Sequence, residues 1–211
     1  MREERLEIDG VPARVYDPGD STGVLLLGHG ASQSKDDELY VHLGRQFATE
    51  TGLAVVCIDA LNHGERLVES GAAWQADAAE TMVSDWQKSA DAVSSLGAAV
   101  AYVGFSMGMI FGAPTVAAMP SIKAAVFGVG GVPDPSMRER MLAIAAQLTH
   151  PQVLMVNMTQ DEIFSTEGTH AFFDAIPGRK KRLMFWEGAH SALPSEAVRH
   201  SIAFVNRYVA R

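Results

Sequence analysis

A serine between two glycines is the first feature of the sequence that indicates covalent chemistry. Gly104, Ser106 and Gly108 form a Gly-x-Ser-x-Gly motif between an apolar run that ends at Val103 and a helical segment that begins at Met107. A serine on a tight strand-to-helix turn exposes its hydroxyl, and side chains at the flanking glycines would collide with neighbouring backbone. We therefore predict Ser106 as a nucleophile, the alternative being an N-cap of the following helix.

A serine hydroxyl needs a base to remove its proton and a third group to orient that base. Asp161 and His190 each follow a short apolar run further along the chain. Such loops meet at the carboxyl ends of parallel strands, so both side chains are expected near Ser106. Glu162 and Glu187 are alternative acids, because they lie close to Asp161 and His190 in the sequence.

Acyl transfer also requires donors that stabilise a tetrahedral oxyanion, and these are usually backbone amides. The amide of Met107 follows the nucleophile directly. A second donor is expected in the loop after the turn 28–30, where Ala31 is favoured over Ser32. The alternative for residues 28–30 is a simple tight turn out of a strand.

Two kinds of segment alternate along the chain. Short apolar runs predict buried strands, and longer segments with helical spacing lie between them. The strands are expected at 24–27, 54–58, 99–103, 124–127, 153–156 and 182–186, and the helices at 37–49, 75–96, 107–118, 136–148, 166–176 and 195–209. The pattern predicts an α/β fold, a mostly parallel sheet with helices on both faces. Residues 6–16 predict an added antiparallel hairpin that turns near Asp9 and Gly10.

The composition limits the function classes. The 211 residues, 47% hydrophobic and 20% charged, fit one domain over 1–211. A formal charge of -8 disfavours nucleic acid as a partner, and the short basic stretch 179–182 is interpreted as a solvated turn. One cysteine, a charged N-terminus and no apolar run long enough for a membrane helix predict a cytoplasmic protein without a membrane partner.

The sequence resembles the α/β-hydrolase superfamily, and within it the compact enzymes around dienelactone hydrolase and the small serine carboxylesterases. The resemblance extends from about Val24 to Val209. Its matching pieces are His29-Gly30, Asp59, Asn62-His63-Gly64-Glu65-Arg66, Gly104-Phe105-Ser106-Met107-Gly108, Thr159-Gln160-Asp161 and Glu187-Gly188-Ala189-His190. The resemblance implies a catalytic triad of Ser106, Asp161 and His190. Dienelactone hydrolases carry cysteine where Ser106 stands, which favours ordinary ester hydrolysis here.

Two segments are short enough to predict a minimal cap or none. They are 67–75, which contains Trp74, and 132–148. A small cap implies an open, shallow pocket and therefore compact ester substrates. We assign Ser32, His63 and Trp74 to substrate binding.

The sequence lacks the motifs that several other classes of protein require. The sequence has no His-Glu-x-x-His zinc motif, no Gly-x-Gly-x-x-Gly dinucleotide motif and no phosphate-binding loop ending in Gly-Lys-Ser/Thr, so we expect no metal and no cofactor. The same triad also serves thioesterases, lactone, dienelactone or peptide hydrolases and perhydrolases, and a non-enzymatic binding protein of this fold is a further alternative. The expected partner is a small-molecule ester, and the expected state is a monomer or small homo-oligomer.

Overall fold

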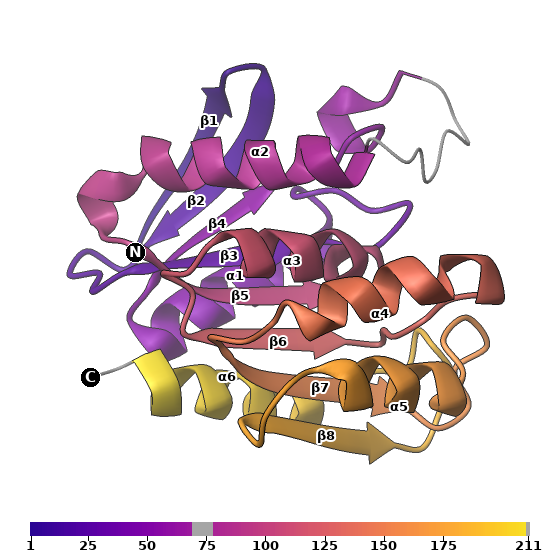
Figure 1. The fold of residues 1–211 in the computed structure, drawn as a ribbon. Helices are drawn as coiled ribbons and strands as arrows, with labels where there is room; N and C mark the ends of the chain where they lie inside the picture. The colour runs from indigo at the N-terminus through magenta and orange to yellow at the C-terminus, as the bar shows by residue number, and fades with distance from the viewer. Residues whose placement is uncertain (69–77, 210–211) are drawn as a thin grey trace.

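The computed structural model describes residues 1–68 and 78–209, and one eight-stranded sheet forms the centre of this part (Figure 1). The strands are β1 (Arg2–Ile8), β2 (Val11–Asp17), β3 (Val24–Gly28), β4 (Ala54–Ile58), β5 (Ala99–Phe105), β6 (Ala124–Gly128), β7 (Gln152–Met158) and β8 (Lys181–Trp186). Their order in the sheet is β1-β2-β4-β3-β5-β6-β7-β8. β2 pairs antiparallel with both β1 and β4, and all the other pairs are parallel. The mostly parallel sheet and the N-terminal hairpin are confirmed.

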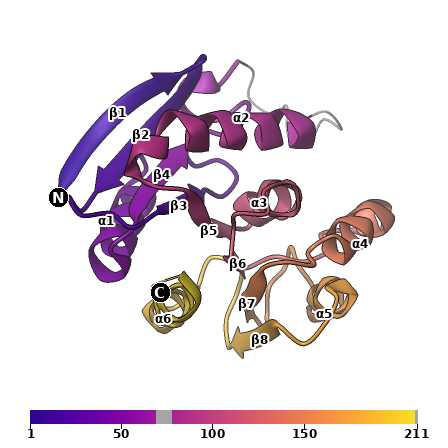
Figure 2. The same cartoon turned by 60° about the vertical axis from the view of Figure 1, so that its left-hand side comes forward.

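Six α-helices of the described chain cover the two faces of the sheet (Figure 2). They are α1 (Glu38–Thr51), α2 (Ala78–Ala92), α3 (Met107–Ala118), α4 (Arg138–Ala146), α5 (Thr166–Ala175) and α6 (Ser195–Val209). α1 and α6 lie on one face, and α2 to α5 lie on the other. The expected start of the second helix at residue 75 lies outside the described residues, and this helix ends at Ala92, before a short 3-10 turn at Ser94–Leu96. Within 1–68 and 78–209, no helix combines the length and the apolar character that a membrane crossing requires.

The central strands are apolar throughout because both of their faces are covered. In β3, Val24 and Leu26 belong to the core under α2 to α5, whereas Leu25 and Leu27 belong to the core under α1 and α6. Since successive side chains point to opposite faces, a strand covered on both sides shows a continuous apolar run instead of alternation. This explains why the runs were visible in the sequence.

The order of the strands creates one place where loops diverge. The chain passes from β3 outward to β4 and then crosses back to β5, so β3 lies between them. In an open parallel sheet, such a reversal leaves a crevice beyond the carboxyl ends of the strands. The loops after β3 and β5 border this crevice.

Glycines allow α3 to approach the sheet closely. A Cβ atom on Gly104 would lie 2.4 Å from the carbonyl oxygen of Gly108, and one on Gly108 would lie 2.3 Å from the carbonyl oxygen of Gly28. The hydroxyl of Tyr102 donates a hydrogen bond of 2.7 Å to the carbonyl of Gly108. The steric requirement predicted for the glycines beside Ser106 is therefore present.

The Gly112→Ala variant tests this close approach. An added Cβ would lie 2.1 Å from Cε1 of the fully buried Tyr102 ring. Overpacking a core costs about 1–3 kcal/mol, and the gain in helix propensity offsets up to about 1 kcal/mol. We expect the free energy of unfolding, measured by urea denaturation, to fall by about 1–2 kcal/mol. Ala118→Ser, at an exposed position of α3, serves as the control, and equal stability of Gly112→Ala and the parent would refute the contact.

Candidate active site

Ser106 occupies a sharp turn between β5 and α3. Its backbone has φ 55° and ψ -118°, a region that residues other than glycine rarely adopt. The amide of Ser106 donates to the carbonyl of Gly128 at the end of β6 (2.8 Å), and its carbonyl accepts from the amide of Met109 (2.9 Å). The sheet and the helix thus hold the turn from both sides. β5 continues to Phe105, two residues further than predicted, so the turn is tight.

The imidazole of His190 lies between Ser106 and Asp161. Its Nε2 is 2.9 Å from Oγ of Ser106, and its Nδ1 is 2.8 Å from Oδ2 of Asp161. An ionised carboxylate can only accept, so Nδ1 donates to Asp161 and Nε2 is left to accept from the serine hydroxyl. The structure therefore brings together side chains from the loops after β5, β7 and β8.

Both oxygens of the Asp161 carboxylate are used. While Oδ2 contacts His190, Oδ1 accepts from the amides of Ile163 (2.9 Å) and Phe164 (2.8 Å). The side chain of Asp161 is 0% exposed. The ring of Phe164 stacks on the imidazole at a centroid distance of 5.7 Å. The carboxylate and the imidazole consequently have fixed orientations.

The alternative acids lie elsewhere. Glu162 accepts a hydrogen bond of 3.0 Å from the backbone amide of His190, and this bond lowers the pKa of Glu162. Glu187 is exposed. Of the carboxylates considered from the sequence, Asp161 is the one bonded to the imidazole.

The loop after β3 is held by His29 and Tyr40. The Nδ1–H of His29 donates to the carbonyl of Gly30 (2.8 Å), and its Nε2 accepts from the amide of Ala60 in the loop after β4 (2.9 Å). The hydroxyl of Tyr40 in α1 accepts from the amide of Gly30 (2.8 Å). These bonds require a neutral imidazole, and burial lowers the pKa of His29. Ala31 follows this fixed segment directly.

A buried ammonium group ties the same loop to the loop after β4. The side chain of Lys35 is 1% exposed, and its Nζ contacts carboxylate oxygens of Asp59 (3.0 Å), Asp36 (3.0 Å) and Glu65 (2.5 Å). The amide of Lys35 also donates to Asp59 (2.9 Å). Burial alone would lower the pKa of Lys35, but the bonds to the three carboxylates outweigh it and raise the pKa. The partners of Lys35 and of the His29 ring include residues far away in the sequence, such as Asp59 and Ala60, so no local pattern predicts these contacts.

A cavity of about 590 Å³ opens beside Ser106 and His190. Its walls come from α1, α6 and the loops at the carboxyl ends of the strands. The lining residues are Gly30, Ala31, Ser32, Gln33, Leu39, Tyr40, Leu43, Phe105, Ser106, Val129, Ile163, His190, Ser191, Leu193 and Val198. The lining is mainly apolar, and none of its described residues is Asp, Glu, Lys or Arg. Ala31 and Ser32 lie on the cavity wall.

The other residues assigned from the sequence have different positions. Met107 is the first residue of α3, and an amide in a first helical turn has no acceptor within the helix. His63 is not among the described lining residues of this cavity, and its assignment to substrate binding stays a prediction. Its ring packs against His29 at 5.6 Å and its Nδ1 contacts the carbonyl of Leu61 (2.9 Å), so it supports the loop. Trp74 lies outside the described residues.

The described residues add neither a reactive thiol nor a metal-binding cluster to this site. Cys57 is fully buried in β4, and burial raises the pKa of its thiol. No group of three or more His, Cys, Asp or Glu side chains within 1–68 and 78–209 is arranged to hold a metal ion. The segment 132–148 contributes α4, which packs against α3 and α5 and does not line the cavity.

The sequence matches a known protein family. The sequence profile described as the alpha/beta hydrolase family matches residues 24–208. The chain belongs to the alpha/beta hydrolase family. A search of the curated proteins gave no significant match.

Several solved structures share the fold of this chain. The chain is 27% identical to a cold-adapted esterase from an Arctic intertidal metagenomic library, solved with bound PEG, over 98% of this chain and 93% of that chain, with a TM-score of 0.85. It is also similar to TT1662 from Thermus thermophilus (19% identity, 98% and 97% coverage, TM-score 0.81). A third is an esterase from Pyrococcus furiosus (16% identity, 98% and 93% coverage, TM-score 0.78). The family and the first esterase support a hydrolase, and the two more distant structures support the fold.

The neutral state of His29 predicts a pH dependence of stability. In the unfolded chain His29 takes up a proton near its ordinary pKa of 6.5, whereas the folded protein resists protonation. The unfolded state thus binds more protons below pH 6.5, so this contribution to stability is complete above that pH and is lost as the pH falls. We expect His29→Gln to have lower stability and a smaller loss between pH 7 and pH 5, measured by urea unfolding.

The control for this experiment is His42→Gln, at an exposed position of α1. It should keep the pH dependence of the parent protein. An unchanged pH dependence in His29→Gln would show that the imidazole is not the group that resists protonation.

Proposed function

We propose that the chain is a serine hydrolase that cleaves small carboxylic esters through an acyl-enzyme on Ser106. The proposal depends on one observation, the hydrogen-bonded chain from Asp161 through His190 to Oγ of Ser106 at the wall of a cavity. Membership of the alpha/beta hydrolase family and the likeness to an esterase support the same class of reaction.

In the proposed mechanism, Oγ of Ser106 attacks the ester carbonyl while Nε2 of His190 takes its proton. Asp161 stabilises the imidazolium that forms, and the amides of Ala31 and Met107 hold the oxyanion. Collapse of this intermediate expels the alcohol, which receives the proton from Nε2. Water then attacks the acyl-enzyme by the same steps and releases the carboxylic acid.

The strained turn and the buried acid are suited to this sequence of steps. Ser106 is held with its hydroxyl in contact with the imidazole before a substrate arrives, so little reorganisation is needed. The two amide bonds to Oδ1 of Asp161 keep Oδ2 directed at Nδ1. The imidazole is therefore held in the tautomer that can accept the serine proton.

The lining of the cavity supports a neutral substrate. Among the described lining residues, the ionisable groups are those of His190 and Tyr40. A charged ester group near the carbonyl would lose hydration without gaining an oppositely charged partner among them. Ser32 is the proposed polar contact for the substrate, since its side chain stands on the wall next to Ala31. Esters with compact apolar groups fit this environment.

Ser106→Ala should abolish turnover. We expect kcat to fall by about a millionfold, because other triad enzymes lose about that factor when the nucleophile is removed. A fluorophosphonate probe should label the parent protein stoichiometrically and leave the variant unlabelled. Near-parental turnover in a folded Ser106→Ala protein would reject the proposal, and absent labelling of the folded parent would favour a non-enzymatic binding protein.

A matched pair of acid variants tests the third residue. Asp161→Asn should lower kcat by about ten-thousandfold, since the amide favours the wrong imidazole tautomer. Glu162→Gln removes a neighbouring carboxylate that accepts from the backbone amide of His190, whereas the imidazole is bonded to Asp161. It should retain most of the turnover, and an equal loss in the two variants would contradict the assignment of Asp161.

A chain-length series tests the substrate class. Among p-nitrophenyl esters, kcat/KM should be highest for acyl groups of about two to six carbons, because long chains need a deep apolar channel. Val198→Phe narrows the cavity and should shift the optimum to shorter acyl groups, whereas Leu67→Phe, exposed and outside the lining, should not. A maximum at long acyl groups would contradict the proposal, and faster turnover of matched thioesters or lactones would assign those substrates instead.

A further inference from the structure

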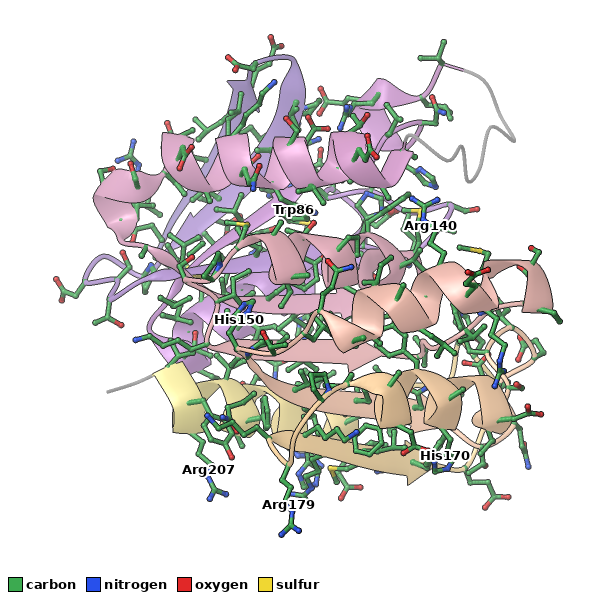
Figure 3. All side chains as sticks on the ribbon, viewed as in Figure 1. Trp86, Arg140, His150, His170, Arg179 and Arg207 are labelled. Carbon is green, nitrogen blue, oxygen red and sulfur yellow. The ribbon has the colours of Figure 1, made fainter. Side chains whose placement is uncertain are left out.

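A second cavity, of about 240 Å³, lies at the opposite end of the sheet from Ser106. It is bordered by the first residues of β7 and β8 and by the last turns of α6. Since β5 to β8 are parallel and Ser106 follows the end of β5, this second cavity is separate from the candidate active site. Figure 3 shows Arg179 and Arg207 on this margin of the molecule, beyond the ribbons of β8 and α6.

The lining of the second cavity is strongly basic. Arg179, Lys180, Arg182 and Arg207 contribute exposed side chains to it together with His200, and no Asp or Glu is among the described residues that line it. In the described residues, no salt bridge joins these four Lys and Arg side chains to a carboxylate. Their side chains are exposed and available to a ligand.

This clustering is not explained by a shortage of acidic residues. The chain has 25 Asp and Glu against 17 Lys and Arg. Other arginines of the described chain have carboxylate partners within 4.0 Å, among them Arg2, Arg5, Arg14, Arg45, Arg66 and Arg138. Like charges gathered without counterions repel one another, so this cavity attracts anions against the negative charge of the whole protein.

The strand pattern directs the basic side chains to one face. Lys181 also lines the cavity, but its ammonium group donates to carbonyls at the end of α5, those of Phe173 (2.7 Å), Asp174 (3.1 Å) and Ile176 (2.7 Å). Arg182, the next residue of β8, points to the opposite face because successive strand residues alternate, and Lys180 directly precedes the strand. The bonds from Lys181 to the end of α5 therefore fix the start of β8 and the basic side chains beside it.

We propose that this cavity binds the phosphate group of a small phosphorylated molecule. Guanidinium groups match two phosphate oxygens at once, and an ammonium group adds a further charge. The aromatic rings of Phe204 and Tyr208 and the side chains of Leu154 and Met184 provide an apolar wall for the remainder of such a molecule. The volume suits a compact ligand and is too small for a folded partner.

Isothermal titration calorimetry of the full chain at low ionic strength, with pyrophosphate and separately with inorganic phosphate, tests the proposal. We expect saturable binding of one pyrophosphate, and a loss of affinity of at least about tenfold in Arg179→Gln/Arg182→Gln. The control Arg138→Gln/Arg199→Gln makes the same change of net charge at exposed positions outside the cavity and should retain the affinity. Ester turnover should be equal in all three proteins, since Ser106 is remote.

Three results would overturn the proposal. They are an absence of saturable binding to either phosphate probe, an unchanged affinity in the cavity variant, and an equal loss in the control variant. In a second arm, the protein is sedimented with phosphatidylcholine vesicles with and without phosphatidic acid. Binding to the acidic vesicles without binding to pyrophosphate would assign the patch to a membrane surface and would equally refute a small soluble ligand.

Discussion

The position of Ser106 depends on direct backbone contact between the start of α3 and the ends of β3 and β5. Gly28, Gly104 and Gly108 meet there with no room for a single Cβ atom. The nucleophile candidate between them adopts a conformation that an ordinary loop would not maintain. The sheet, the helix and the end of β6 together overcome that local strain. The geometry of the site is therefore a property of the packed fold.

Polar groups buried near the carboxyl end of the sheet fix the loops that the strands alone would leave free. His29 bonds to backbone on two loops, and the ammonium group of Lys35 bonds to three carboxylates. A buried polar group that loses its partner costs much more than an exposed one, so these loops resist displacement. This rigidity fixes the segment that leads into Ala31, which lines the same cavity as Ser106.

The two ends of the sheet have different chemistry. Among the described residues, the carboxyl end of the sheet holds a mainly apolar cavity beside the hydrogen-bonded Ser106, His190 and Asp161, whereas the amino end of β7 and β8 carries a basic cavity that no described carboxylate lines. α6 connects them, since its first turns border one cavity and its last turns border the other. The same scaffold thus places the proposed acyl-transfer site and the proposed anion site at opposite ends of the sheet.

The sequence alone determined the strands, the helices and the order of the reactive residues. Apolar runs mark strands covered on both faces, and the Gly-x-Ser-x-Gly motif marks a steric requirement that is local in the chain. Only the tertiary structure decided which carboxylate meets His190, since Asp161 and Glu162 are adjacent in sequence and differ only in the direction of their side chains. It also decided that His63 packs on His29 and that the cavity is walled by α1 and α6, because these contacts join residues far apart along the chain.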